Sequence, residues 1–266
     1  MATPIGNLSD ITARAVDALK TVEIVACEDT RRCRTLLRHV GAAPSELISL
    51  HDRNETAASR RTLEHLRAGA DVALVSDAGT PLLSDPGYEL VRLAFDAGIR
   101  VIPVPGVSAV TAALSASPVA ANRFTFEGFL PPRRRRRKEI LSRMLARPEA
   151  TVFFEAPHRV AETFADLLDL GAAEREIVLC RELTKVFETI VHGTVADVAR
   201  VIETHKGEFV CILAGCGEQS PPLSGGEVLR VLLEELPPSR AARLAARLTG
   251  ADRAELYRQA VALARD

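Results

Sequence analysis

The sequence predicts a two-domain α/β protein with a small helical extension at its C-terminal end. Three observations lead to this prediction. Strand and helix patterns alternate through the first half, polar glycine-containing loops follow the strands, and two proline-containing segments interrupt the alternation. These segments, at 118–122 and 220–222, divide the 266 residues into predicted domains at 1–117, 118–219 and 220–266.

The first predicted domain is a run of short strands joined by helices. Apolar segments predict strands at 22–27, 47–50, 72–75 and 100–104, and apolar residues at helical spacing lie between them. Such alternation with short connections indicates a mostly parallel sheet covered on both faces. The carboxyl ends of its strands share one edge, so we expect the polar loops to meet there, where open α/β sheets bind ligands.

The second predicted domain has a different pattern. It begins with the alternating segment FTFEGF at 124–129, and further strands are predicted at 151–154, 177–180, 188–192 and 208–213 in a mixed sheet. Residues 131–138 are expected to be a loop leading into a helix. The three helical patterns at 224–235, 239–248 and 253–264 are compatible with a helix-turn-helix, and equally with an appendage that serves packing or solubility.

Composition excludes several classes of protein. The chain is 47% hydrophobic and 26% charged with a net charge of −1, so no global field attracts it to nucleic acid. No leader pattern and no apolar run of roughly 20 residues is present, which predicts a cytoplasmic protein without a membrane partner. The five cysteines form no CxxC pair and the histidines are scattered, so we expect reduced thiols and no metal.

Common nucleotide and hydrolase motifs are missing. The sequence contains no GxGxxG, no GxxxxGK[ST] and no GxSxG. A rim of polar loops with small residues remains. Such a rim suits a medium-sized polar ligand that is held by backbone groups.

Six motifs together resemble the ribosomal RNA small subunit methyltransferase I family of the tetrapyrrole methylase superfamily. In chain order they are TPIGNL at 3–8, EDTR at 28–31, SDAGTPLLSDPG at 76–87, PVPGVSA at 103–109, EAPHR at 155–159 and RELTK at 181–185. The resemblance implies the tetrapyrrole methylase fold and transfer of a methyl group from S-adenosylmethionine (AdoMet). The implied acceptor is the 2′-hydroxyl of a cytidine in the decoding region of 16S rRNA, and the implied partner is free 16S rRNA or the assembled 30S subunit. It also implies a homodimer with AdoMet between the two α/β domains.

The resemblance and the chemistry of AdoMet together predict the cofactor-binding residues. Loop motifs supply most of them, Asp77, Thr80 and Ser108 offer polar partners for the ribose and amino-acid ends, and Leu83 and Ala214 offer an apolar slot for adenine. The predicted set is Pro4, Ile5, Asp77, Gly79, Thr80, Leu83, Ser108, Ala109, Glu155, Leu183 and Ala214.

A ribose hydroxyl is a poor nucleophile unless a proton acceptor takes its hydrogen. The candidate catalytic residues are Glu28, Asp29, Glu155, Glu182 and, if desolvation lowers its pKa, Lys185. For each of them the alternative is a structural ion pair, because each acid has an Arg or Lys within a few residues. The sequence leaves this choice open.

RNA binding requires cations around the cleft. The predicted contacts on motif loops are Arg31, Arg32, Arg53, His158, Arg159 and Arg181, where His158 has a helix cap as its alternative role. Arg133, Arg134 and Arg135 belong to the basic block 133–138. That block is expected to be a mobile phosphate clamp, or else the solvated start of a helix.

Two rival functions and one departure from the family accompany this prediction. The rivals are a superfamily enzyme that methylates a tetrapyrrole or a protein side chain, and a ribosome-associated RNA-binding protein without catalysis. Family members normally carry a short apolar strand before TPIGNL, which this sequence lacks. We therefore expect either that the natural start lies upstream of Met1 or that the chain is truncated.

Overall fold

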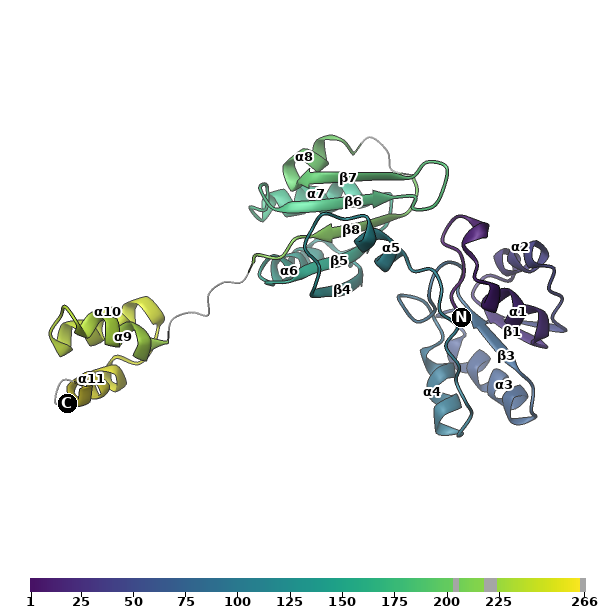
Figure 1. The fold of residues 1–266 in the computed structure, drawn as a ribbon, viewed down its shortest axis with the longest axis horizontal. Coiled ribbons are helices and arrows are strands. Elements are labelled where there is room, and N and C mark those ends of the chain that lie inside the picture. The colour runs from purple at the N-terminus through teal and green to yellow at the C-terminus, as the bar shows by residue number, and fades with distance from the viewer. Residues whose placement is uncertain (203–205, 218–223, 264–266) are drawn as a thin grey trace. The chain divides into compact units, whose positions relative to one another are not determined.

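A computed structural model describes residues 1–202, 206–217 and 224–263 of the chain. The chain forms two compact units, Met1–Gly215 and Cys216–Asp266. The first unit contains two sheets, which fall on either side of the boundary expected at 117/118 (Figure 1). The linker expected at 220–222 lies outside the described residues.

The first sheet is parallel, as expected from the alternating pattern. Its strand order is β2-β1-β3, with Val25 of β1 paired to Leu47 of β2 and Ala73 of β3. The strands are Ile24–Cys27 (β1), Glu46–Ser49 (β2) and Val72–Val75 (β3). The surrounding helices are the 3-10 turn Leu8–Asp10 (η1), Ala13–Thr21 (α1), Thr30–Val40 (α2), Glu55–Arg67 (α3) and Tyr88–Asp96 (α4).

Strand β1 explains why both faces of this sheet are covered. All four of its side chains are buried, and alternate residues point to opposite faces. Val25 and Cys27 pack with α1 and α2, whereas Ile24 and Ala26 pack with α3 and α4 (Figure 1). A strand that is apolar at every position is typical of the centre of a parallel sheet.

The strand expected at 100–104 is absent, and that prediction is wrong. The segment is extended. Among the described residues, its backbone–backbone hydrogen bond is the one from Ala2 N–H to the Val104 carbonyl. Val101 and Ile102 are exposed by 37% and 58%. An apolar sequence can be extended anywhere, but a strand also needs a neighbour that pairs its backbone groups. The chain continues into Ala109–Ser115 (α5).

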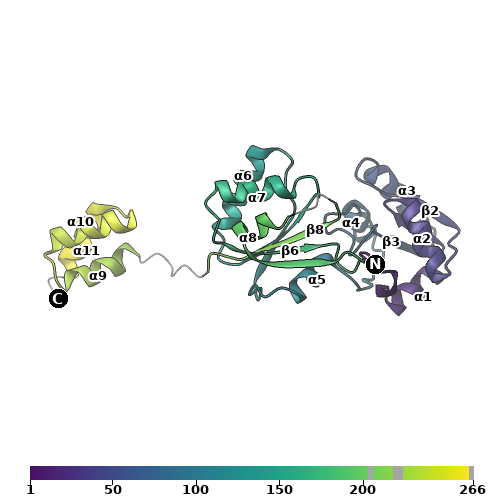
Figure 2. The same ribbon diagram turned by 90° about the horizontal axis from the view of Figure 1, so that it is seen from above.

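The second sheet is mixed, as expected. Its order is β4-β5-β8-β6-β7, in which β4 and β5 are parallel and the other neighbours are antiparallel. Helices α6, α7 and α8 cover one face and α5 covers the other (Figure 2). The strands are Phe124–Phe129 (β4), Ala150–Glu155 (β5), Glu176–Arg181 (β6), Thr189–Thr194 (β7) and Phe209–Leu213 (β8). The helices are Arg134–Leu145 (α6), Val160–Asp169 (α7) and Val195–Arg200 (α8).

The second unit is helical and has its own apolar core. It consists of Gly225–Leu233 (α9), Pro238–Thr249 (α10) and Arg253–Leu263 (α11). Ser224 and Glu227 form a capping box at the start of α9, and Gly250 ends α10 in a left-handed conformation. No helix in the described part of the chain is long and apolar enough to cross a membrane.

Candidate functional site

The carboxyl edge of the first sheet gathers acidic side chains from separate loops. Glu28 follows β1, Asp52 follows β2, and Asp77 and Asp85 follow β3. Burial raises the pKa of Glu28, and the charges of Asp77 and Asp52 raise it further. Burial also raises the pKa of Asp85 to about 6, with Glu28 as the strongest repulsive neighbour. This edge therefore holds carboxyl groups that ionise less readily than usual.

Backbone bonds fasten three motif loops to one another beside this edge. Thr3 and Gly79 form a two-way bridge, with N–H to O distances of 2.8 and 2.9 Å. The Thr80 hydroxyl donates to the Val107 carbonyl at 3.1 Å, and Ala2 N–H donates to Val104. Gly79 has a φ of +84°, a conformation that costs glycine little. The loops after β3 and before α5 are thus held against the first loop of the chain.

Backbone strain is concentrated in two of the motif loops. The non-glycine residues with positive φ among the described residues are Leu82, Ser84, Glu182 and Thr184. Left-handed backbone costs such residues roughly 1–2 kcal/mol each. The turn after β6 is held by Lys185 N–H to Glu182 C=O at 3.0 Å and by Thr184 N–H to the Glu188 carboxylate at 2.5 Å. Strain of this kind is often found where a fold positions functional groups.

The first loop and the turn after β6 touch, although 177 residues separate them. Asn7 N–H donates to the Thr184 hydroxyl at 3.1 Å. Gly6 lies so close to the turn that an added Cβ would stand 2.4 Å from Lys185 Cγ and 2.8 Å from Thr184 Oγ1. Glycine at position 6 is thus required by close approach. This contact brings the two sheets' loops into one site.

A cleft of about 360 Å³ opens at this contact. Its lining combines the first loop, one side of α2, the loop after β3, the turn after β6 and the residue before β8. The lining residues are Thr3, Pro4, Ile5, Gly6, Leu8, Arg32, Thr35, Leu36, Asp77, Ala78, Lys185 and Glu208. Pro4, Ile5, Asp77, Arg32 and Lys185 were all predicted as site residues from the sequence.

Two of the predicted proton acceptors lie in structural pairs. Asp29 caps α2, and hydrogen bonds from the Arg31 side chain and backbone lower its pKa to about 2. The Glu155 side chain is buried, with one oxygen 2.8 Å from Ala156 N–H and from Arg159, and the other 2.6 Å from the Thr163 hydroxyl. Both carboxylates are fully engaged in holding local structure.

The Glu182–Lys185 pair is also engaged. Lys185 Nζ lies 2.8 Å from Glu182 and 3.1 Å from Glu208. Burial alone would lower the pKa of Lys185, but these bonds outweigh it and raise the pKa, so the condition set for Lys185 as a base is not met. Burial alone would likewise raise the pKa of Glu182, but Lys185 and the Glu208 N–H lower it. Among the predicted carboxylate acceptors, Glu28 is the one whose pKa is raised.

The remaining predicted cofactor residues fall into three groups. Gly79, Thr80, Ser108 and Ala109 belong to the joined loops, and Leu83 is 40% exposed beside them. Leu183 is buried against the same apolar layer as Ile5. Ala214 also contacts this layer. It follows the last residue of β8, whereas Glu155 pairs with Phe209, the first residue of that strand. The structure therefore separates Ala214 from Glu155 along the length of a strand.

The expected loop at 131–138 is wrong, because helix α6 begins within the basic block, and contact of the block with phosphate stays a prediction. Arg133 precedes α6 and the other arginines form its first turns. Arg134 pairs with Asp166 and Asp169, and Arg137 is 1% exposed and pairs with Asp166. Positive charge at a helix N-terminus is unfavourable, and these acids of α7 compensate for it. The block therefore fastens α6 to α7, while Arg133 and Arg135 stay exposed.

The other residues predicted to contact RNA differ in their exposure and in whether their charge is already paired. Arg31 pairs with Asp29 but is 87% exposed, and Arg32 pairs with Asp77 in the cleft. Arg159 is 13% exposed and bound to Glu155, so its charge is internal. Arg181 donates to the Lys206 carbonyl at 2.9 Å. Arg53 and His158 are exposed.

Sequence reasoning missed Thr3, Gly6 and Glu208 as parts of the cleft. Thr3 and Gly6 lie inside the TPIGNL motif, and the glycine was a signal that another segment passes close by. Glu208 had no local signal, because its role depends on strand β8 lying beside β6. Described residues include no group of three or more His, Cys, Asp or Glu side chains arranged to hold a metal ion.

Comparison with known proteins gives two matching family models. The model of the tetrapyrrole (corrin/porphyrin) methylases matches residues 2–199. The model of the RsmI C-terminal HTH domain matches residues 220–264.

Curated relatives align over nearly the whole chain. A protein of Xylella fastidiosa is 48% identical over 97% of this chain and 96% of its own length. A protein of Pseudomonas aeruginosa is 46% identical over 98% and 95% of the two chains, and one of Escherichia coli O157:H7 is 42% identical over 97% and 92%. All three are named ribosomal RNA small subunit methyltransferase I.

Solved structures share the fold at low sequence identity. Uroporphyrin-III C-methyl transferase of Thermus thermophilus, complexed with S-adenyl homocysteine, has a TM-score of 0.56 and 21% identity over 82% of this chain and 95% of that one. Diphthine synthase has a TM-score of 0.60 and 14% identity over 80% and 88%.

Proposed function

Because the chain belongs to the tetrapyrrole methylase family, we propose that it transfers a methyl group from AdoMet to the 2′-hydroxyl of a cytidine in the decoding region of 16S rRNA. Identity of 42–48% over nearly the whole chain to relatives named ribosomal RNA small subunit methyltransferase I is the observation that carries the substrate class. The cytidine, the ribose position, the 30S subunit as partner, a homodimer and a cytoplasmic location are parts of the same proposal.

The cleft and its adjoining loops have the chemistry that AdoMet requires. Adenine needs an apolar surface, which Ile5, Ala78 and Leu183 offer, and the ribose and amino-acid ends need polar groups such as Asp77 and Thr80. Leu82 and Leu83 are 37% and 40% exposed beside the strained loop, so they are free to pack on a ligand. AdoMet, when bound, supplies an electrophilic methyl group carried on a sulfonium.

We favour Glu28 as the proton acceptor. The ribose oxygen must lose its proton as the new bond to carbon forms, so an acid with a raised pKa accepts that proton more readily than one held ionised by a cation. Asp29, Glu155, Glu182 and Lys185 are bound in ion pairs, whereas burial and the neighbouring Asp77 raise the pKa of Glu28. The same residue lies directly after β1 and next to Asp29, whose N–H donates at 2.9 Å to Asp77 of the cleft lining.

The first test is methyl transfer from labelled AdoMet to 30S subunits from a strain lacking this modification, with the modified nucleotide mapped. We expect a 2′-O-methylcytidine in the decoding region. Glu28→Gln should lower kcat by about 100-fold or more while the affinity for AdoMet stays within a factor of two. The acidic limb of the kcat/KM profile should also vanish.

Glu64→Gln on the exposed side of α3 is the matched control, and it should behave as the unsubstituted chain does. Methylation of a base, or of a tetrapyrrole in place of rRNA, would overturn the proposed function. Full activity of the Glu28→Gln chain would exclude Glu28 as the acceptor and leave the proposed reaction standing.

A further inference from the structure

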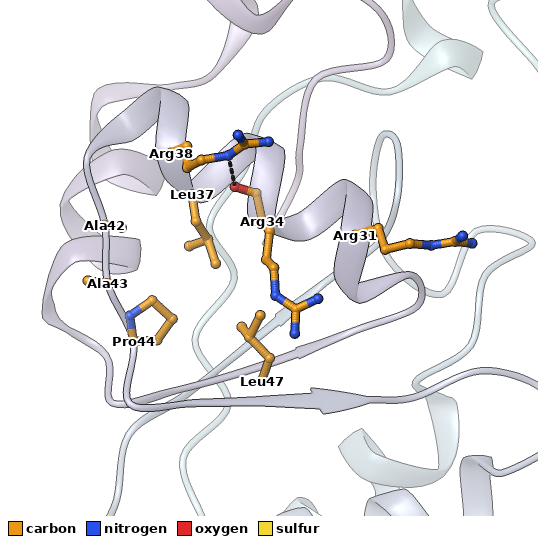
Figure 3. Close-up of a pocket in the computed structure, with 8 residues that line it drawn as sticks. All are labelled: Arg31, Arg34, Leu37, Arg38, Ala42, Ala43, Pro44 and Leu47. Carbon is orange, nitrogen blue, oxygen red and sulfur yellow. Dashed lines mark hydrogen bonds between the residues drawn. The ribbon is translucent and has the colours of Figure 1, made fainter.

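A second hollow lies against α2, on another side of the helix from the cleft. It is a groove of about 640 Å³, within the range of ligand-binding pockets. Its lining residues are Arg31, Arg34, Leu37, Arg38, Ala42, Ala43, Pro44 and Leu47 (Figure 3). Arg32, Thr35 and Leu36 of the same helix line the cleft, so the two hollows flank one helix.

The groove is basic at its rim and apolar at its floor. Arg34 extends from α2 toward Leu47 of β2, and Leu37 points from the same helix toward Pro44 and Leu47 (Figure 3). No acidic residue belongs to the lining. A surface that combines guanidinium groups with an apolar floor suits a nucleotide, because a phosphate binds the cations while a sugar or base face covers the apolar side chains.

Arg34 and Arg38 differ from Arg31 and Arg32 of the same helix, whose positive charges are paired with acids. Arg31 pairs with Asp29, and Arg32 pairs with Asp77. Within the described part of the chain no ion pair with an acid is recorded for Arg34 or Arg38; Arg38 instead donates to the Arg34 carbonyl at 3.4 Å and to the Thr35 hydroxyl at 3.3 Å. Like charges four residues apart on a helix repel each other. An anionic partner would remove that cost.

We propose that this groove binds the backbone of a single-stranded rRNA segment that flanks the nucleotide in the cleft, with phosphates at Arg34 and Arg38. This inference rests on the proposed function, since it takes rRNA as the substrate. Single-stranded RNA can splay its nucleotides out, as a strand crossing α2 from the groove to the cleft would need. Neither arginine is a member of the six sequence motifs.

The test is equilibrium binding of an unmodified 16S rRNA decoding-region transcript and of 30S subunits across a range of KCl concentrations. The Arg34→Gln/Arg38→Gln chain should bind both about tenfold more weakly than the unsubstituted chain at moderate salt. The slope of log K against log [KCl] should fall by about 1.4, the loss expected for two phosphate contacts with a single strand. Affinity for AdoMet should not change.

Arg60→Gln/Arg67→Gln is the control, because it removes two exposed arginines from α3 and thus the same charge from another surface. It should leave the binding and its salt slope unchanged. Equal losses in both variants would mean that only net charge matters, and would overturn the groove. If the variant lost binding to 30S subunits but not to the transcript, the groove would bind a ribosomal protein. That result would also overturn the proposal that it binds rRNA.

Failure of the proposed function is distinguishable from failure of this inference. The first appears as absence of methyl transfer by the unsubstituted chain. The groove is judged on binding alone, and unchanged binding of rRNA by the Arg34→Gln/Arg38→Gln chain would refute it whether or not methyl transfer occurs.

Discussion

At the scale of single residues, local charge decides which acids are available for chemistry. The sequence left five candidates unranked, and each of the four acids among them has a cation nearby in the chain. In the folded structure Glu155 lies beside Arg159 and Thr163, and Glu182 lies beside Lys185. Burial raises the pKa of Glu28, and Asp77 and Asp52 raise it further against the opposing charges of Arg32 and His51. Distances across the fold, which a sequence does not contain, separate these cases.

Asp85 provides a pH-dependent prediction at this scale. Burial raises its pKa from 3.8 to about 6, so the folded state favours the protonated form. Its stabilising contribution is complete below pH 3.8 and is lost as the pH rises through about 6. The Asp85→Asn chain should therefore gain free energy of unfolding relative to the unsubstituted chain at pH 8, and should gain nothing at pH 4.

Urea unfolding at pH 4, 6 and 8 measures this difference. Asp96→Asn, on the exposed side of α4, is the control and should show no pH-dependent gain. A difference between the two chains that stays constant across the three pH values would contradict the assigned pKa.

At the scale of elements, the site depends on the approach of one loop to one turn. Residues 3–6 reach the turn after β6, and Gly6 leaves no room there for a side chain. The strained residues Glu182 and Thr184 hold that turn in place. The motifs indicated that both segments matter. Their contact joins residues that lie 177 positions apart in the chain, so it follows only from the tertiary structure.

Gly6→Ala tests this contact. Its φ is not in the left-handed region, so the effect is steric: the added Cβ would meet Lys185 Cγ at 2.4 Å and Leu183 C=O at 3.0 Å. Overpacking of this kind costs about 1–3 kcal/mol, so we expect AdoMet affinity to fall by about tenfold or more. Isothermal calorimetry measures it.

Gly193→Ala in β7 is the matched control, because its Cβ would meet Asp197 Cβ at an ordinary distance of 3.4 Å. It should bind AdoMet as the unsubstituted chain does. Normal binding by the Gly6→Ala chain would show that the loop and the turn do not need to touch.

At the scale of the whole molecule, each unit has its own core. The buried apolar residues of the first unit come from both sheets and their helices, and those of the second include Leu229, Ala241 and Leu256. Separate cores predict separate folding.

A chain ending at Gly217 should keep its far-UV circular dichroism per residue for the α/β part and its affinity for AdoMet. Loss of AdoMet binding on this truncation would contradict the prediction.

The sequence by itself determined the α/β class, the parallel and mixed sheets, the helical second unit and the family. Hydrophobic periodicity and contiguous motifs are local properties, so they can be read along the chain. Tertiary structure alone decided which motifs meet, that residues 100–104 lack a pairing strand, and that Arg134 and Arg137 of the basic block pair with Asp166 and Asp169. It also decided that Arg34 and Arg38 form no ion pair with an acid among the residues that the structure describes. Each of these depends on residues distant in the chain, because pairing, burial and charge compensation are properties of neighbours in space.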